Sequence, residues 1–290
     1  MKWPMMPRLR QPGGWASILR IAWPLVILIL WVLLAVAGPM LSVTPERITL
    51  PNILIGPNPD AWLGYDDLGR PVWDRLVAGA RISLFVSVSV TSISCLIGAM
   101  IGTLSGWFGG ILDHVVARIM DVFLAFPGIL LAIAMAGILG PGIGNIMIAL
   151  VVVGWVGFAR LARAQTLSLK HRDHVRAAEA LGCGLPRIAL HHLLPLLAAP
   201  LIVEVTFGIA NVVIAEAGLS FLGLGVQPPT ASWGSVIRDG TRYMLVAPHL
   251  VLAPGAALML VVLSINTLGD RLRDWMDVRS RMPGRTRNDP

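Results

Sequence analysis

The 290-residue sequence has few charged residues. Asp, Glu, Lys and Arg make up 13% of it, whereas soluble domains average roughly 25%. Apolar residues make up 56%. This balance excludes an ordinary soluble domain and predicts an integral membrane protein. The net charge of +7 comes from basic residues that lie between apolar runs, not in a patch with interleaved aromatics, so no nucleic-acid partner is predicted.

Cysteine and lysine are also scarce. Cys95 lies in an apolar run and Cys183 in a basic segment, which excludes a disulfide framework. Lys2 and Lys170 are the only lysines, and neither follows glycine or precedes Ser or Thr. The phosphate-cradling P-loop is therefore absent, and we predict that this chain itself binds no ATP.

Long charge-free runs predict six transmembrane helices, because a bilayer core of roughly 30 Å needs about 20 apolar residues per helix. Residues 122–159 are uncharged and too long for one helix, and Gly140-Pro141-Gly142 divides them in two. The predicted fold class is an all-α membrane protein with spans at about 21–38, 83–106, 118–139, 143–160, 198–222 and 246–268.

Basic residues near the helix ends predict the orientation. Most Lys and Arg residues fall on the cytoplasmic side if both termini lie in the cytoplasm. The predicted layout is a cytoplasmic segment at 1–20, an outer loop at 39–81, a cytoplasmic loop at 161–197 and a cytoplasmic tail at 271–290. Ala35-Val36-Ala37 resembles a signal cleavage site, but cleavage would leave five spans and invert the charge bias.

Small and hydroxyl residues repeat at spacings of three and four in the second predicted span, which places them on one helix face. We interpret this stripe as a close helix-packing surface, with a polar path lining as the alternative. Its members are Ser83, Ser87, Thr91, Ser94, Gly98, Gly102 and Ser105.

Acidic residues within the spans need a partner or a wet cavity, because a charge at the bilayer centre costs about 2.5–3.5 kcal/mol. At about 100° per residue, Asn211 lies within about 20° of Glu204, whereas Glu216 lies about 120° away. We predict Asp121, Glu204, Asn211 and Glu216 as candidates for a path or gate, with Glu216 the strongest. An ion pair with Arg118 is the favoured reading of Asp121, and a structural role remains open for Glu204.

The loop at 161–197 carries the clearest local pattern. Val175–Gly182 has good helix formers and a glycine stop, and Pro186 can start another helix. The adjacent Ala177 and Ala178 leave a narrow surface that could enter a groove on another protein; a helix lying idle at the lipid headgroups is the alternative. The four histidines of this loop lack ligand spacing, so no metal site is predicted.

Spaced as they are, Ala177-Ala178, Gly182 and Leu194-Pro195 resemble the EAA loop of bacterial ABC importer permeases. Further segments are similar to the dipeptide, oligopeptide and nickel branch, and they follow in order: Asp67–Arg70 with Gly79–Leu84, Arg118–Pro127, Glu216–Gly225, Pro228–Gly234 and Asn266–Asp274. Together they resemble the second permease of the pair, the dipeptide-permease C type.

This resemblance implies a type I importer permease fold with its core at 82–270, in the bacterial inner membrane. It implies a heterodimer with a second permease, two ATPase subunits that hold ATP and Mg, and an extracytoplasmic binding protein docked on 40–80 and 223–242. This chain would be no enzyme and would bind no cofactor. The residues implied to couple it to the ATPase are Val175, Arg176, Ala177, Ala178, Glu179, Leu181, Gly182 and Pro195.

Two positions depart from the family pattern. Arg176 stands where the loop has Glu, and His192 where it has Ile, so we expect a compensating acid on the partner or a contact through Glu179 instead. Import of di- or oligopeptides is the leading function, and import of nickel or a nickel chelate is the alternative within the fold. A self-sufficient proton-coupled carrier is a remote alternative. A membrane-embedded enzyme is disfavoured because the spans offer no nucleophile with a His-Asp partner.

Overall fold

The computed structural model describes residues 14–41 and 44–276, and within these ranges it is helical with no β-strand, as the predicted all-α class requires. The elements are α1 (Gly14–Ala37), η1 (Gly38–Met40), η2 (Leu50–Asn52), α2 (Val72–Phe108), α3 (Gly110–Leu124), α4 (Gly128–Leu139), α5 (Ile143–Leu169), α6 (Asp173–Ala180), α7 (Leu185–Ile188), η3 (Ala189–Leu193), α8 (Leu194–Phe221), α9 (Trp233–Thr241) and α10 (His249–Met276).

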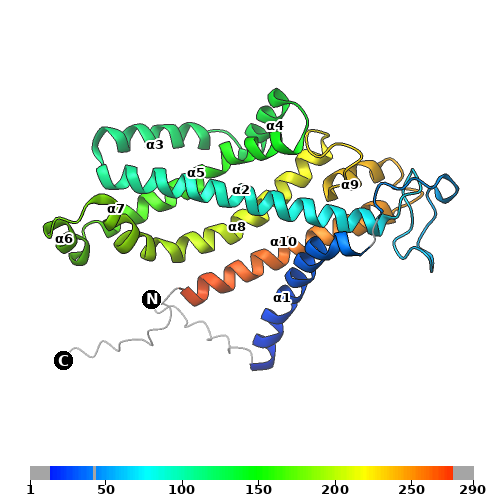
Figure 1. Cartoon of the computed structure of the whole chain (residues 1–290), viewed down its shortest axis with the longest axis horizontal. Helices are drawn as coiled ribbons and strands as arrows, with labels where there is room; N and C mark the ends of the chain where they lie inside the picture. The colour runs from blue at the N-terminus through cyan, green and yellow to red at the C-terminus, as the bar shows by residue number, and fades with distance from the viewer. Residues whose placement is uncertain (1–13, 42–43, 277–290) are drawn as a thin grey trace, which may run out of the picture.

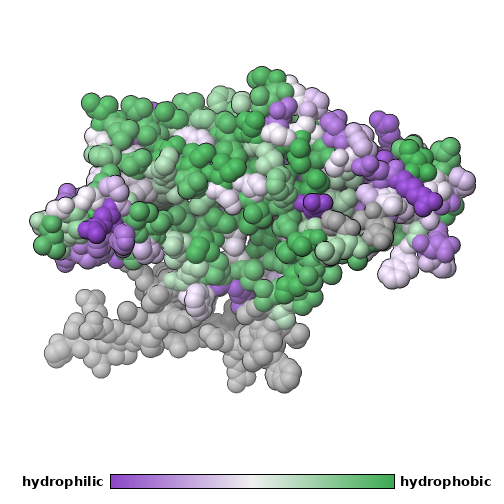
Figure 2. Space-filling model, in the orientation of Figure 1, coloured by the Kyte–Doolittle hydropathy of each residue, from purple (hydrophilic) through white to green (hydrophobic). Residues whose placement is uncertain are grey.

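The long helices α2, α5, α8 and α10 run along the long axis of the molecule (Figure 1). The short helices α6 and α7 lie at one end of this axis, and α9 lies at the other with the segment 44–71. On the face shown in Figure 2, apolar residues cover the middle of the molecule and polar residues gather at both ends. This distribution is that of a protein whose long axis crosses a membrane. We call the two ends the α6 end and the α9 end.

Four helices of the described chain are long and apolar enough to cross a membrane: α2, α5, α8 with its preceding turns, and α10. A fifth span results if α3 and α4 together count as one. In α1 the apolar stretch described is Ala22–Ala37, which is shorter than these. The chain is therefore a multi-pass membrane protein, and the count of six spans stays a prediction, as does the placement of both termini in the cytoplasm.

One continuous helix over 118–139 was predicted, and this is wrong. The segment divides into α3 and α4, which meet at 87°. Pro127 lies between them and is extended, with φ −57° and ψ 122°. Proline has no N–H to donate and disfavours the helical conformation in the residue before it, so the helix ends before Pro127 and restarts after it.

Two other helices continue past the predicted apolar spans. α2 begins at Val72, and α5 runs on to Leu169. Apolar length marks only the part of a helix inside the bilayer, and polar residues can extend the same helix into water.

The small-residue stripe of α2 packs against α5. A Cβ added at Gly98 or Gly102 would overlap a backbone oxygen of α5, that of Trp155 or Ala159. Ser83, Ser87 and Ser105 are buried in the same row. The helix-packing interpretation is therefore confirmed, since glycine is what lets the two backbones approach so closely.

Candidate functional site

Helix α6 is anchored along one side and free along the other. Val175 and Ala178, one turn apart, are buried in an apolar cluster with residues of α7, η3 and α8. The opposite side holds Arg176, Ala177 and Glu179, which are all exposed. Leu181, just beyond the helix, is 84% exposed. The helix thus presents a small, mostly polar surface at the very end of the molecule (Figure 1).

Gly182 stops α6 by a left-handed backbone conformation with φ +80°. Its N–H donates to the Glu179 carbonyl at 2.9 Å, and the Cys183 N–H donates to the Ala178 carbonyl at 3.0 Å. These bonds satisfy carbonyls that the helix end leaves without partners. The glycine stop is where the sequence predicted it, and Pro186 and Pro195 stand in the first turns of α7 and α8.

Helix α5 leads directly into α6, and two of its side chains contact the end of α2 and the start of α3. Arg163 of α5 donates to both carboxylate oxygens of Asp113 on α3, at 2.5 and 2.6 Å, and Ser105 donates to the same carboxylate at 2.7 Å. Lys170 donates to the Gly106 carbonyl near the end of α2, at 2.8 Å. We call these the α5 latch. No sequence pattern predicts the α5 latch, because residues 113 and 163 are far apart in the chain.

We expect Asp113→Asn to destabilise the chain by about 1–3 kcal/mol, because it removes the charge partner of a part-buried Arg163. Thermal melting in detergent is measured for Asp113→Asn, for Arg163→Gln and for the double variant. The three changes in stability give the coupling energy between the two residues. The matched control is Asp121→Asn, which removes the acid of the exposed Arg118–Asp121 pair, and it should change little. Equal effects of the two substitutions would contradict the latch.

Two clefts open along α5 and α8. The first, of about 580 Å³, lies where α4 turns away from α3, and we call it the elbow cleft; its lining includes Gly128, Ala132, Leu150, Asn211 and Ala215. The second, of about 590 Å³, is nearer the α6 end, and we call it the α8–α10 cleft; its lining includes Leu161, Gln165, Val203, Glu204, Phe207 and Arg273.

The two clefts follow one face of the helix pair. On α5 their linings continue from Leu150 to Gly154 and then to Leu161 and Gln165, at helical spacing. Between them, a Cβ added at Gly157 would lie 3.4 Å from the Glu204 carboxylate. The elbow cleft is mostly apolar, whereas about half of the α8–α10 cleft wall is polar, with Gln165, Glu204 and Arg273 among its side chains.

Of the four predicted path residues, the structure brings Glu204 and Asn211 to this face and leaves the other two elsewhere. Asp121 lies on α3, exposed and 3.8 Å from Arg118, so the predicted local ion pair is confirmed. Glu216 is fully buried and accepts hydrogen bonds from Ser83 of α2 at 3.0 Å and from Ser220 at 2.8 Å. That geometry favours a role for Glu216 in holding α8 against α2, and its role in a path stays a prediction.

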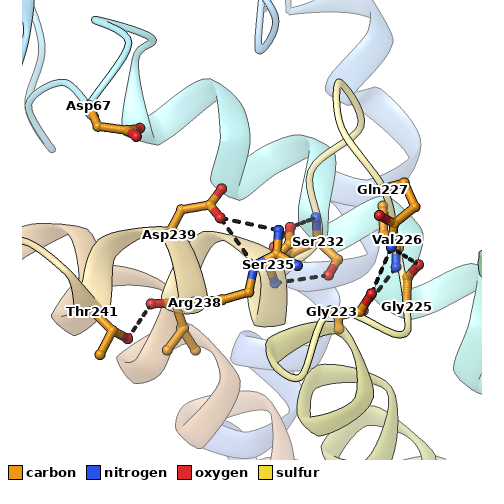
Figure 3. Close-up of polar contacts among 12 residues, drawn as sticks. Asp67, Gly223, Gly225, Val226, Gln227, Ser232, Ser235, Arg238, Asp239 and Thr241 are labelled. Carbon is orange, nitrogen blue, oxygen red and sulfur yellow. Dashed lines mark hydrogen bonds and ion pairs between the residues drawn. The ribbon is translucent and has the colours of Figure 1, made fainter. Parts of the chain in front are cut away.

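A buried ion-pair network fixes the segment before α2 to α9. Asp66 accepts from Arg70 at 2.7 Å and from Arg75 at 2.8 Å, and Arg75 also donates to Asp239 of α9 at 3.1 Å. Figure 3 shows Asp239 held in turn by its neighbour Arg238, at 3.2 Å. A surface at this end is therefore built from two distant stretches of sequence.

Asp67 lies beside this network, with a carboxylate oxygen 3.6 Å from the Arg70 guanidinium. Burial and the negative charges of Asp66 and Asp239 raise the pKa of its carboxyl more than Arg70 and Arg75 lower it. The folded chain therefore holds this proton to higher pH than the unfolded chain, so ionised Asp67 disfavours folding at neutral pH. We expect Asp67→Asn to raise the melting temperature at pH 7 by about 1–2 °C.

The gain from Asp67→Asn should shrink as the pH falls from 7 to about 3, because the acid is protonated in both states below the usual Asp pKa of about 3.9. Melting curves at the two pH values test this, with the exposed Asp60→Asn as the control. A gain that does not change with pH would assign the effect to something other than the charge.

A family model described as "Binding-protein-dependent transport system inner membrane component" matches residues 98–282. The chain belongs to this family. The matched range contains α6, the α5 latch and the α5 and α8 walls of both clefts, whereas residues 66–75 of the ion-pair network lie before it.

Relatives of this permease are similar over most of its length. A dipeptide transport system permease protein of Alkalihalophilus pseudofirmus is 40% identical over 258 residues, covering 89% of this chain and 85% of the relative. A glutathione transport system permease protein of Escherichia coli is 42% identical over 226 residues, covering 78% and 75%. The predicted permease family is therefore confirmed.

A solved structure shows the same fold. The permease is similar to a chain of the MetNI methionine ABC transporter, described as inward facing, with a TM-score of 0.53. The match has 21% sequence identity and covers 70% of this permease and 97% of that chain. The likeness shows that the helices share the type I importer arrangement.

Proposed function

We propose that this chain is one of two permeases in an ATP-driven importer of di- or oligopeptides in the bacterial cytoplasmic membrane. Relatives named for dipeptides and glutathione support this substrate class. The α6 end faces the cytoplasm in this proposal, and two ATPase subunits hold the ATP and Mg. A binding protein outside the cell delivers the solute to the α9 end.

The observation that carries the proposal is the form of α6. Val175 and Ala178 hold it firmly to the chain, while Ala177 and Leu181 stand out at the end of the molecule. A short rod anchored on one side and free on the other can sit in a cleft of an ATPase subunit. Closure of that subunit on ATP would then push the rod as a rigid body.

Arg176 sets the chemistry of this contact. It is exposed and lines a polar hollow with Lys170, His171 and Glu179. A cation there favours an acidic side chain on the ATPase surface. Glu179, one turn along, can contact a basic side chain of the ATPase. The two contacts together would fix the orientation of α6 in the ATPase cleft.

Movement of α6 reaches the clefts through α5. Because the α5 latch holds the α2–α3 turn to α5, displacement of α6 would move α3 with it. The elbow cleft and the α8–α10 cleft would then change width, which is the basis of alternating access in this proposal. The exposed Arg118–Asp121 pair lies among exposed apolar residues of α3, which include Val115, Ile119 and Val122, and a second permease covering that face would keep these charges away from lipid.

Reconstitution tests the function. The chain is co-expressed with the second permease, ATPase subunits and binding protein from its own gene cluster, and uptake of labelled alanyl-alanine into proteoliposomes is measured. We expect uptake only with ATP and the ATPase subunits. Uptake by the purified chain alone on a proton gradient would favour the proton-coupled carrier. Nickel uptake without peptide uptake would favour the nickel importer.

A further inference from the structure

The strongest unassigned feature is the pair of opposite charges on the walls of the α8–α10 cleft. We infer that this cleft binds a zwitterionic solute at its two ends, with Glu204 receiving an ammonium group and Arg273 a carboxylate. The inference rests on the proposed import function and adds a solute site within the permease, separate from the binding protein.

Glu204 and Arg273 come from different helices and both line the cleft, with Gln165 of α5 beside them. Neither Glu204 nor Arg273 has an ion-pair partner within the part of the chain that the structure describes. Glu204 is half-buried within a predicted span, where an unpaired charge is costly, and the ammonium group of a ligand would offset that cost. Arg273 is exposed near the end of α10, beyond the predicted span, where a carboxylate of the same ligand can reach it.

The two charges lie at a similar depth. A Cβ added at Gly269 of α10 would be 3.1 Å from Thr206 and 3.2 Å from Phe207, so α10 crosses α8 at this point. From Figure 1, the two helices run in opposite directions. Arg273 is one turn, about 6 Å, beyond Gly269 towards the α6 end, and Glu204 is displaced from Phe207 in the same direction. Both therefore flank the same part of the cleft.

The space matches a short peptide. The cleft holds about 590 Å³, within the range of roughly 300–1,000 Å³ usual for small-ligand sites. An extended chain gains about 3.4 Å per residue, so the termini of a di- or tripeptide are separated by distances that two walls of one cleft can bridge. Gly157 of α5 leaves the space beside the Glu204 carboxylate open, since a side chain there would contact it.

The charge pattern predicts selectivity. A carboxylate alone would favour any cation, and a guanidinium alone would favour any anion. Opposite charges in one cleft favour a solute that carries both a positive and a negative group. Blocking either end of a peptide should leave one wall charge without a partner. We expect roughly tenfold weaker occupancy for a peptide with an acetylated amino end or an amidated carboxyl end.

Photolabelling of the assembled transporter without ATP tests the site. The probes are alanyl-benzoylphenylalanine, its N-acetyl form and its C-terminal amide, and labelled segments are mapped by mass spectrometry. The free peptide should label α8 and α10 segments about tenfold more than either blocked form. Equal labelling by all three probes in the unchanged chain would overturn the inference, and this comparison depends on no variant.

Substitutions then assign the two ends. Glu204→Gln should lose the preference for a free amino end and keep the preference for a free carboxyl end. Arg273→Gln should lose the preference for a free carboxyl end and keep the preference for a free amino end. Asp121→Asn, an exposed acid outside the cleft, is the matched control and should keep both preferences. Unchanged preferences in both cleft variants would overturn the residue assignment.

The proposed function and this inference can fail separately. ATP-driven uptake by the unchanged transporter decides the function. The labelling pattern needs no turnover and decides the site. Uptake with indifferent labelling rejects the site alone, and selective labelling without uptake rejects the import function alone.

Discussion

Replacing Gly182 with valine is expected to abolish ATP-driven uptake while the chain still reaches the membrane and assembles. At φ +80° a β-branched residue is strained by about 1–2 kcal/mol or more, so the backbone after α6 would be redirected. No atom lies within 4 Å of a Cβ added there, so the core is left intact. The defect should therefore fall on the coupling surface: uptake is lost, while detergent-extracted yield and elution volume stay normal.

Gly184→Val is the matched control, two residues along in the same exposed loop. Its φ is −67°, which valine adopts readily, and an added Cβ meets only Pro186, at 3.8 Å. We expect this variant to keep most of the uptake. Normal uptake by Gly182→Val, or equal loss in both variants, would reject the assignment of α6 and its glycine stop to ATPase coupling.

Replacing Gly102 with leucine is expected to prevent folding. The first atom of the new side chain would overlap the Ala159 carbonyl oxygen and lie 2.9 Å from the Arg163 nitrogen, both of which belong to the α5 backbone. Core overpacking usually costs roughly 1–3 kcal/mol when side chains can shift, and here the obstacle is a helix backbone. Forcing α2 away from α5 would open the whole contact. Fluorescence-detected size-exclusion chromatography should show loss of the monodisperse peak.

Gly137→Leu serves as the control for Gly102→Leu. Gly137 also lies inside a helix, α4, but it is exposed and nothing lies within 4 Å of an added Cβ. Both substitutions replace glycine with leucine, which raises the helix propensity by the same amount at each position. A monodisperse Gly102→Leu chain, or aggregation of Gly137→Leu, would show that the close approach of α2 and α5 is not what the fold depends on.

Local chemistry is what the sequence predicted well. The apolar runs located α2, α5, α8 and α10, and the glycine and proline signals located α6, α7 and the start of α8. The rotation of about 100° per residue placed Asn211 and Glu204 on one helix face, away from Glu216. Each of these inferences needs only residues that are neighbours along a single helix.

Long-range geometry was not predictable in this way. The Asp113–Arg163 contact joins two helices, and no spacing rule reaches across that distance. Glu216 looked like a path residue because a lone acid in a span suggests function, yet Ser83 and Ser220 satisfy it inside the fold. The break at Pro127 was visible in the sequence, but its angle depends on how α4 packs against α5 and α8, which helix propensity does not encode.

The right angle between α3 and α4 has a mechanical consequence. The 12 residues of α4 form an arm about 18 Å long, set across the axis of α3. If α3 rotates about its own axis by about 10°, the far end of α4 moves sideways by about 3 Å, because α4 is perpendicular to that axis. Such a rotation would shift α4 against α5 and α8, the other two helices that line the elbow cleft.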